Sequence, residues 1–257
     1  SDYYFYNGKK INILEKVKNI LIKIPTIKKT IVFPYNQREK TTFKNFVDFN
    51  EALNNSNLDE NFERFDFNHP IYILYSSGTT GKPKCITHGA GNVLIEHNKE
   101  FMLHCDVRDN EKLFYYTTTG WMMWNWLVGG LATGSSIFLF DGAPVYPTID
   151  VLLKYCQDKQ INLFGVSAKY IDHLKNENYN SKNLDLSSLK IITSTGSPLA
   201  EESFKYVYEN IKQNVHLASI AGGTDLVGCL ILGNLFSNVY KGEIQGRRNG
   251  ALVSAEN

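Results

Sequence analysis

The sequence of 257 residues lacks several features that would mark a particular class of protein. Its four cysteines form no C-x-x-C pair, so neither a disulfide framework nor a common zinc-binding pattern is indicated, and reduced thiols are the simpler interpretation. No apolar run approaches the roughly 20 residues that span a bilayer. The net charge is only +1, so no strong field favours nucleic acid or an anionic membrane. We therefore expect a cytoplasmic protein with neither kind of partner.

What the sequence does contain is a regular alternation of strand-like and helix-like segments from residue 71 onward. The strand-like segments are nearly continuous apolar runs, which is typical of strands covered by helices on both faces. Strands that alternate with helices of this length favour parallel βαβ units. We predict an α/β fold with a mostly parallel sheet flanked by helices. The expected strands are residues 71–75, 112–118, 136–140, 162–166, 190–194 and 215–220, and the expected helices are residues 92–103, 121–132, 149–159, 168–176 and 200–213.

A leading segment, residues 1–70, precedes this core, which we place at residues 71–245. Apolar side chains at helical spacing indicate one early helix, and Pro25 ends it. The elements expected in the leading segment are a helix at residues 11–24, a strand at 30–35, a helix at 43–53 and a polar connection at 54–70.

A run of small residues and lysines, SSGTTGKPK, follows the first strand of the core. Glycines let backbone N–H groups approach an oxyanion closely, hydroxyls add neutral donors, and a lysine supplies a point charge that suits phosphate. The run predicts a phosphate-binding loop, although a Ser/Gly surface turn is the plain structural alternative. Its candidate binding residues are Ser76, Ser77, Gly78, Thr79, Thr80, Gly81 and Lys84.

This loop differs from the common nucleotide loop G-x-x-x-x-G-K-[ST]. Only two residues separate Gly78 from Gly81, and Pro83 follows Lys82. Because proline disfavours helix at the residue before it, we expect the loop not to lead directly into a helix, and to fold over a triphosphate instead. The lack of that common loop, and of a kinase-type H-R-D segment, disfavours a phosphotransferase.

Three further strand ends combine glycine with hydroxyl or aromatic residues. The sequences TGWMMW, TGSPL and AGGTD follow the expected strands at residues 112–118, 190–194 and 215–220. In parallel sheets, ligands bind beyond the carboxyl ends of the strands. One shared anionic ligand would account for these sequences together.

These motifs are similar to those of a known group of enzymes. YSSGTTGKPKCITHG, residues 75–89, resembles the phosphate loop of the acyl-adenylate-forming superfamily, which includes acyl-CoA synthetases, luciferases and adenylation domains. TTTGWMMWN, FGVSAKY, ITSTGSPL, IAGGTD and VYKGEIQ resemble the acetoacetyl-CoA synthetase branch, and the resemblance covers nearly the whole chain. It implies that residues 1–257 are part of the large N-terminal AMP-binding domain of such an enzyme.

The resemblance implies an acid–thiol ligase that works in two steps. The acid is joined to ATP to give an acyl-adenylate and pyrophosphate, and the acyl group then passes to the thiol of coenzyme A. ATP, Mg²⁺ and coenzyme A are the implied cofactors, and the branch implies acetoacetate, a short-chain keto acid, as the substrate. The expected partners are therefore small molecules. Catalysis of this kind depends on positioning and on charge stabilisation at the α-phosphate.

The resemblance also assigns individual residues. Thr224 matches the threonine that meets the α-phosphate, and Asp225 stands where most of the superfamily has a metal-binding glutamate, so both are expected to be catalytic, with Asp225 as the Mg²⁺ ligand. Ala221 replaces an aromatic residue that stacks on adenine in many relatives. The other assignments are the loop Ser76–Lys84 to the β- and γ-phosphates, Thr195, Gly196, Ser197, Pro198, Gly222 and Gly223 to the nucleotide, and Trp121, Val166 and Ser167 to the acyl substrate.

Some of these residues have structural alternatives. Trp121 also belongs to a helical stripe with Trp124 and Leu127, which is typical of a packed core. The sequence GGTD, taken alone, is also typical of a simple turn. His97 and His104 lie seven residues apart, and without an acid or cysteine at ligand spacing we interpret them as packing residues rather than metal ligands.

No residue of the sequence matches the lysine in the superfamily's C-terminal lid domain, which neutralises the acyl-phosphate transition state. We therefore expect this chain alone to be inactive or impaired in adenylation. Two alternatives stay open: a non-catalytic, truncated nucleotide-binding module, and a synthetase for acetate or another short-chain or 3-keto acid. The sequence does not separate these acids, because one methylene in an apolar pocket changes binding by only about 1–3 kcal/mol.

Overall fold

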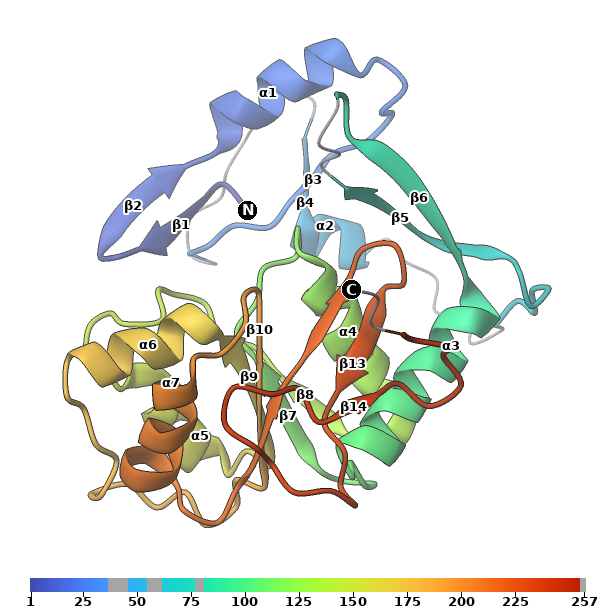
Figure 1. Ribbon diagram of the computed structural model, residues 1–257. Helices are drawn as coiled ribbons and strands as arrows, with labels where there is room; N and C mark the ends of the chain where they lie inside the picture. The colour runs from blue at the N-terminus through green and yellow to red at the C-terminus, as the bar shows by residue number, and fades with distance from the viewer. Residues whose placement is uncertain (37–45, 55–61, 77–80, 255–257) are drawn as a thin grey trace. The chain divides into compact units, whose positions relative to one another are not determined.

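The chain forms two compact units in the computed structural model, which describes residues 1–36, 46–54, 62–76 and 81–254 (Figure 1). The first unit is Ser1–Arg64 with Asp141–Pro147, and the second is Phe65–Phe140 with Thr148–Asn257. The boundary that the sequence predicts, between residues 70 and 71, stays a prediction. The assignment of the whole chain to one partial domain stays a prediction.

The first unit consists of short strands and two helices. Its elements are β1 (Tyr3–Tyr6), β2 (Lys9–Asn12), α1 (Leu14–Lys23), β3 (Ile31–Val32), β4 (Val47–Asp48) and α2 (Phe49–Asn54). Strands β1 and β2 form an antiparallel hairpin, with Asn7 and Gly8 at positive φ in its turn. The buried Asp2 anchors the start of the chain, because its Oδ1 accepts hydrogen bonds of 2.9 Å from the N–H groups of Tyr3 and Tyr35.

The second unit contains a five-stranded parallel sheet and the helices that flank it. Its strands are β7 (Lys112–Tyr115), β8 (Ser136–Phe138), β9 (Leu163–Ser167), β10 (Ile191–Thr195) and β11 (His216–Ser219), in the spatial order β11-β10-β9-β7-β8. The helical segments are α3 (Ala90–Lys99), η1 (Glu100–His104), α4 (Met122–Gly129), η2 (Gly130–Thr133), α5 (Val151–Lys159), α6 (Ala168–Asn176), α7 (Glu201–Tyr206) and η3 (Val207–Ile211). In Figure 1, α5, α6 and α7 gather on one side of this sheet, and α3 and α4 lie on the other. The predicted fold class is confirmed.

Successive side chains of the strands fill two separate cores, which explains the nearly continuous apolar runs. On one face, Leu163 belongs to a cluster with Phe101 and Trp126 from the layer of α3, η1 and α4. On the other face, its neighbour Phe164 lies with Leu174 of α6 and the residues around it. All five side chains are almost completely buried.

Two smaller antiparallel sheets complete this unit. One is the hairpin of β5 (Pro70–Ser76) and β6 (Lys84–Gly89), and the other consists of β12 (Ala221–Gly223), β13 (Gly228–Leu232) and β14 (Gly246–Arg247). The inclusion of residues 71–75 among the parallel strands is therefore wrong. The stretch between β5 and β6 is shorter than a parallel crossover needs, and Pro83 opposes a helix there, so the chain turns straight back.

Other expected elements differ in their bounds. The helix predicted at residues 11–24 begins at Leu14, because residues 9–12 pair with β1. Of the helix predicted at 43–53, residues 43–45 lie outside the described part of the chain, and α2 begins at Phe49. The described helices include none that is both long and apolar enough to cross a membrane.

Candidate functional site

A cavity of about 310 Å³ lies beyond the carboxyl ends of β7, β10 and β11. This is where ligands bind in parallel sheets, and the sheet also reverses its winding direction between β7 and β9. Three segments that follow these strands supply most of the lining. The lining residues are Trp121, Met122, Met123, Thr195, Gly196, Ser197, Pro198, Ser219, Ile220, Ala221, Gly222, Gly223, Thr224, Cys229 and Ile244.

The segment after β10 forms one wall of the cavity. Thr195 ends the strand, and its Oγ1 donates a 2.8 Å hydrogen bond to the carbonyl of Ile220, which ties the ends of β10 and β11 together. Gly196 has φ of +89°, a conformation that side-chain-bearing residues rarely adopt. Among the described residues other than its chain neighbours, no atom lies within 4 Å of the position where a Cβ of Gly196 would be, so this backbone is open to a ligand.

The hairpin of β12 and β13 forms the second wall. Gly222 lies so close to the neighbouring strand that a Cβ there would be 2.0 Å from the carbonyl oxygen of Gly228. Thr224 begins the turn of the hairpin, and its carbonyl accepts a 2.8 Å hydrogen bond from Nε2 of His88. Val227 closes the turn with φ of +51°, which is an outlier for a β-branched residue.

The start of α4 forms the third wall. Trp121 is 38% exposed, whereas Met123, two residues later, also lines the cavity but is 2% exposed and belongs to the core. The tryptophan of this helix that fills the core is Trp126. The geometry at Trp121 is therefore the one expected for a pocket residue, and its role in acyl binding stays a prediction.

The cavity lining is neutral and rich in hydrogen-bonding groups. Among the described lining residues, hydroxyls come from Thr195, Ser197, Ser219 and Thr224, and none carries a charged side chain. Burial raises the pKa of the Cys229 thiol well above its usual range, so it is not a thiolate nucleophile. Such a lining can hold a flat polar group and one oxyanion, but the charge of a polyphosphate must be met from outside it.

The structure brings together the predicted residues Trp121, Thr195–Pro198 and Gly222–Thr224, but other predicted residues do not line this cavity. Val166 is buried on the face of the sheet that α6 covers. Ser167 caps α6 by accepting a 3.3 Å hydrogen bond from the N–H of Tyr170. Their substrate-binding role stays a prediction. Asp225 is exposed, one residue beyond the lining.

The predicted phosphate loop joins β5 to β6. Ser76 and Lys84 pair at the end of this hairpin that the loop connects. Ser77, Gly78, Thr79 and Thr80 lie outside the described residues, and Gly81 follows them. A strand, not a helix, follows the loop, as Pro83 predicts.

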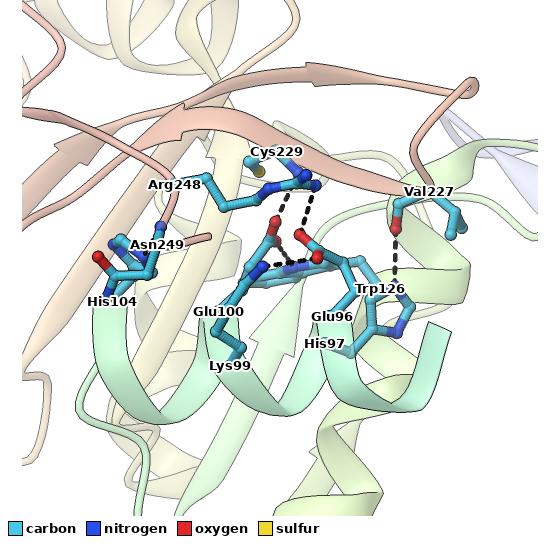
Figure 2. Close-up of polar contacts among 10 residues, drawn as sticks. All are labelled: Glu96, His97, Lys99, Glu100, His104, Trp126, Val227, Cys229, Arg248 and Asn249. Carbon is cyan, nitrogen blue, oxygen red and sulfur yellow. Dashed lines mark hydrogen bonds and ion pairs between the residues drawn. The ribbon is translucent and has the colours of Figure 1, made fainter. Parts of the chain in front are cut away.

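A buried polar cluster that the sequence analysis did not anticipate joins η1, α4 and β13 (Figure 2). Glu100 is fully buried; its Oε2 accepts from Nε1 of Trp126 and its Oε1 from the N–H of Cys229, both at 2.7 Å. It is also hydrogen-bonded to Glu96, whose Oε1 accepts from Arg248 at 2.6 Å. A signal for this cluster was available, since glutamates 96 and 100 fall on one face of a partly apolar helix.

The two carboxyl groups of this cluster differ in protonation. Burial, together with the hydrogen bond to Glu96, raises the pKa of Glu100 to about 8. Burial alone would raise the pKa of Glu96 as well, but the hydrogen bonds from Glu100 and Lys99 and the charge of Arg248 lower it overall. At neutral pH, Glu100 therefore holds the proton and Glu96 the negative charge.

Metal-binding clusters are absent from the described residues, in which no group of three or more His, Cys, Asp or Glu side chains is arranged to hold an ion. His97 and His104 are buried and bonded to the carbonyls of Val227 and Gly233, which agrees with their interpretation as packing residues.

Comparison with known proteins gives consistent matches. The family model described as "AMP-binding enzyme" matches residues 8–244. The acetoacetyl-coenzyme A synthetase of Rhizobium meliloti (strain 1021) is 46% identical over 263 residues, which cover 100% of this chain and 40% of that protein. The acetoacetyl-CoA synthetase of Gallus gallus is 44% identical, with 98% of this chain and 39% of that protein covered. The solved structure of the acetoacetyl-CoA synthetase from Streptomyces lividans superimposes with a TM-score of 0.90 at 35% identity, covering 96% of this chain and 38% of that one. The chain thus spans about 40% of the length of the curated relatives that it matches.

Proposed function

This chain belongs to the AMP-binding enzyme family, and on that premise we propose that it is the nucleotide-binding part of an acid–thiol ligase. The ligase activates a carboxylic acid with ATP and passes the acyl group to coenzyme A. The observation that carries the proposal is that residues 195–198 and 221–224 line one cavity, in which they combine an exposed glycine backbone with several hydroxyls. The names of the similar synthetases favour acetoacetate as the acid.

The residues of the cavity have separate roles in this proposal. The open backbone at Gly196 lies along the adenine ring, and the hydroxyl of Thr224 donates to the α-phosphate. Trp121 closes the acyl end, where a bulky wall suits a short keto acid. Because an oxygen of the acid attacks the α-phosphate, negative charge grows on the phosphoryl oxygens, and donors fixed in advance stabilise it without reorganisation.

The charge of the polyphosphate is met by groups around the cavity. The loop Ser76–Lys84 binds the β- and γ-phosphates, with Lys84 as a point charge. The exposed carboxylate of Asp225, next to Thr224, suits a hard cation such as Mg²⁺, which binds through one or two carboxylates plus phosphate oxygens. When bound, Mg²⁺ would neutralise charge on the phosphates. ATP, acetoacetate and coenzyme A are small cytoplasmic molecules, and we place the protein in that compartment.

Calorimetric titration of this chain with ATP and with GTP tests the nucleotide site. We expect ATP to bind more tightly than GTP, and Thr224→Val, which keeps the shape but removes the hydroxyl, to weaken ATP about tenfold, the equivalent of one good hydrogen bond. Thr26→Val, at an exposed position of the first unit, is the matched control and should bind ATP like the wild type.

ATP–pyrophosphate exchange tests the chemical step and the choice of acid. Exchange that depends on acetoacetate, and less on acetate or a longer 3-keto acid, would support the proposal. A preference for acetate would assign a different synthetase, and ATP binding without exchange, even when the remainder of the synthetase is added separately, would indicate a non-catalytic nucleotide-binding module.

A further inference from the structure

Side chains of β6, α3 and η1 form hydrogen bonds with backbone groups of residues 224–233. His88 donates to the carbonyl of Thr224 at 2.8 Å, and His97 donates from Nε2 to the carbonyl of Val227 at 2.7 Å. Glu100 accepts from the N–H of Cys229 at 2.7 Å. These contacts hold the hairpin turn and the start of β13 at three successive points. Figure 2 shows His97, Glu100 and His104 along one face of the helix.

The contact of His97 falls on the strained part of the turn. Val227 has φ of +51° and is 1% exposed. A β-branched residue in this conformation costs about 1–3 kcal/mol and persists only where its surroundings determine it. A hydrogen bond to the carbonyl of Val227 fixes the orientation of its peptide group and so helps to hold the positive φ. His97 donates that bond.

The surroundings of His97 fix its tautomer and its position. Its Nδ1 is buried and has no hydrogen-bond partner among the described residues, so the donating Nε2 carries the proton. Burial lowers its pKa, which keeps the ring neutral. Gly129 of α4 makes room for the ring, because a Cβ there would lie 2.1 Å from Nδ1. Helix α4 thus accommodates a side chain whose function lies on the neighbouring hairpin.

We propose that His97 is a positioning residue for the nucleotide site: through the carbonyl of Val227 it holds the hairpin turn so that Thr224 stays at the cavity. This inference rests on the proposed function of the cavity. His97 is not among the described residues that line the cavity, and it acts through the backbone of the turn.

Two substitutions of His97 test the proposal, because they place the same amide group at different distances from the carbonyl of Val227. His97→Gln places an amide nitrogen near the former Nε2 and keeps the bond to Val227, whereas in His97→Asn the nitrogen stops near the former Nδ1 and the bond is lost. We expect His97→Gln to bind ATP like the wild type in calorimetry, and His97→Asn to bind about tenfold more weakly, as for the loss of one hydrogen bond.

His104 supplies the matched control, because it makes the same kind of buried bond far from the turn. It donates from Nδ1 to the carbonyl of Gly233 at 2.8 Å, and its Nε2 accepts a second hydrogen bond of 3.1 Å from the N–H of Asn249. Here asparagine keeps the bond to Gly233, whereas glutamine loses it. We expect His104→Gln to lower the melting temperature about as much as His97→Asn does, yet to leave ATP affinity within about twofold of the wild type.

Gly129→Ala tests the same contact in a chain that retains His97, and it adds helix propensity instead of removing a bond. The added methyl group must displace the ring, so we expect weaker ATP binding. The proposal is overturned if His97→Asn and Gly129→Ala bind ATP like the wild type, or if His104→Gln weakens ATP as much as His97→Asn. A folded wild type that does not bind ATP would refute the proposed function itself, and this inference with it.

Discussion

At the scale of single residues, the site depends on side chains that fix backbone groups. Thr224 and Asp225 are identifiable from the sequence because they stand in a recognisable motif. The contacts that His97 and Glu100 make are not identifiable, because their partners lie about 130 residues away in the sequence, at Val227 and Cys229. A helical spacing shows that two side chains share a face, but not which strand that face meets.

Titration of Glu100 is expected to make stability depend on pH. Its pKa is about 8 in the folded chain and about 4.5 otherwise, so between these values the folded state holds a proton that the unfolded state lacks. The stabilisation is complete below the lower value, and the free energy of unfolding should fall by about 1 kcal/mol per pH unit until pH 8. The ionisable groups that face Glu100 are Glu96, Cys105 and Cys229, and Arg248 compensates the charge of Glu96.

Urea unfolding between pH 5 and pH 9 measures this dependence. Glu100→Gln should flatten the profile, whereas Glu209→Gln, an exposed position on η3, should leave it unchanged. An equally steep profile in Glu100→Gln would assign the dependence to another group.

Asp225 should act through the metal rather than through the nucleotide. Mg²⁺ is expected to strengthen ATP binding to the wild type, and Asp225→Asn should lose most of that gain, roughly tenfold in affinity, because a neutral amide oxygen is a weaker ligand than a carboxylate for a hard cation. Titrations with Mg²⁺ and with EDTA give the two affinities. Asp158→Asn on α5 is the control, and an unchanged Mg²⁺ effect in Asp225→Asn would remove Asp225 from the metal site.

At the scale of elements, the alternation of apolar runs predicts the parallel sheet well, and helix α6 matches its predicted bounds at residues 168–176. The hairpins were not predicted. Strand β12 contains two glycines in AGG, and β6 follows a lysine- and proline-containing loop, so neither has the apolar pattern that identifies a strand. Strand β12 forms by pairing with β13 and strand β6 by pairing with β5, and a local sequence pattern does not show these partners.

The close approach of β12 and β13 gives a test at this scale. Gly222→Ala should lower the free energy of unfolding by about 1–3 kcal/mol, because the methyl group would meet the backbone of Gly228 at 2.0 Å and force the strands apart. Gly223→Ala is the matched control, because a Cβ there meets no atom of the described residues within 4 Å; it should change stability by less than about 0.5 kcal/mol. Denaturant unfolding compares the two, and equal stability would contradict the observed packing of the hairpin.

At the scale of the whole molecule, the cavity collects segments that are more than 100 residues apart in the chain, from Trp121 to Thr224 and Ile244. The motifs predicted that these segments share a ligand, because parallel strands present their carboxyl ends at one edge. They did not predict that Val166 and Ser167 lie outside the cavity. The alternation of side chains within a strand does not predict which way a side chain points at the end of the strand, where the backbone leaves the sheet.

The similarity to longer synthetases allows a test of the proposed activity. If this chain replaces the matching segment of the Rhizobium meliloti synthetase, to which it is 46% identical, we expect the chimaera to form acetoacetyl-CoA from acetoacetate, ATP and coenzyme A. Consumption of free thiol measures the rate, and Thr224→Val in the chimaera should lower kcat/KM about tenfold. A chimaera that binds ATP but prefers acetate would contradict the assignment of the acid.

The most direct measurement is a crystal structure of this chain grown with ATP. We predict density for the nucleotide in the cavity, with the base along Gly196 and the α-phosphate within hydrogen-bonding distance of the Thr224 hydroxyl. Nucleotide density elsewhere on the molecule, or an empty cavity at saturating ATP, would contradict the account.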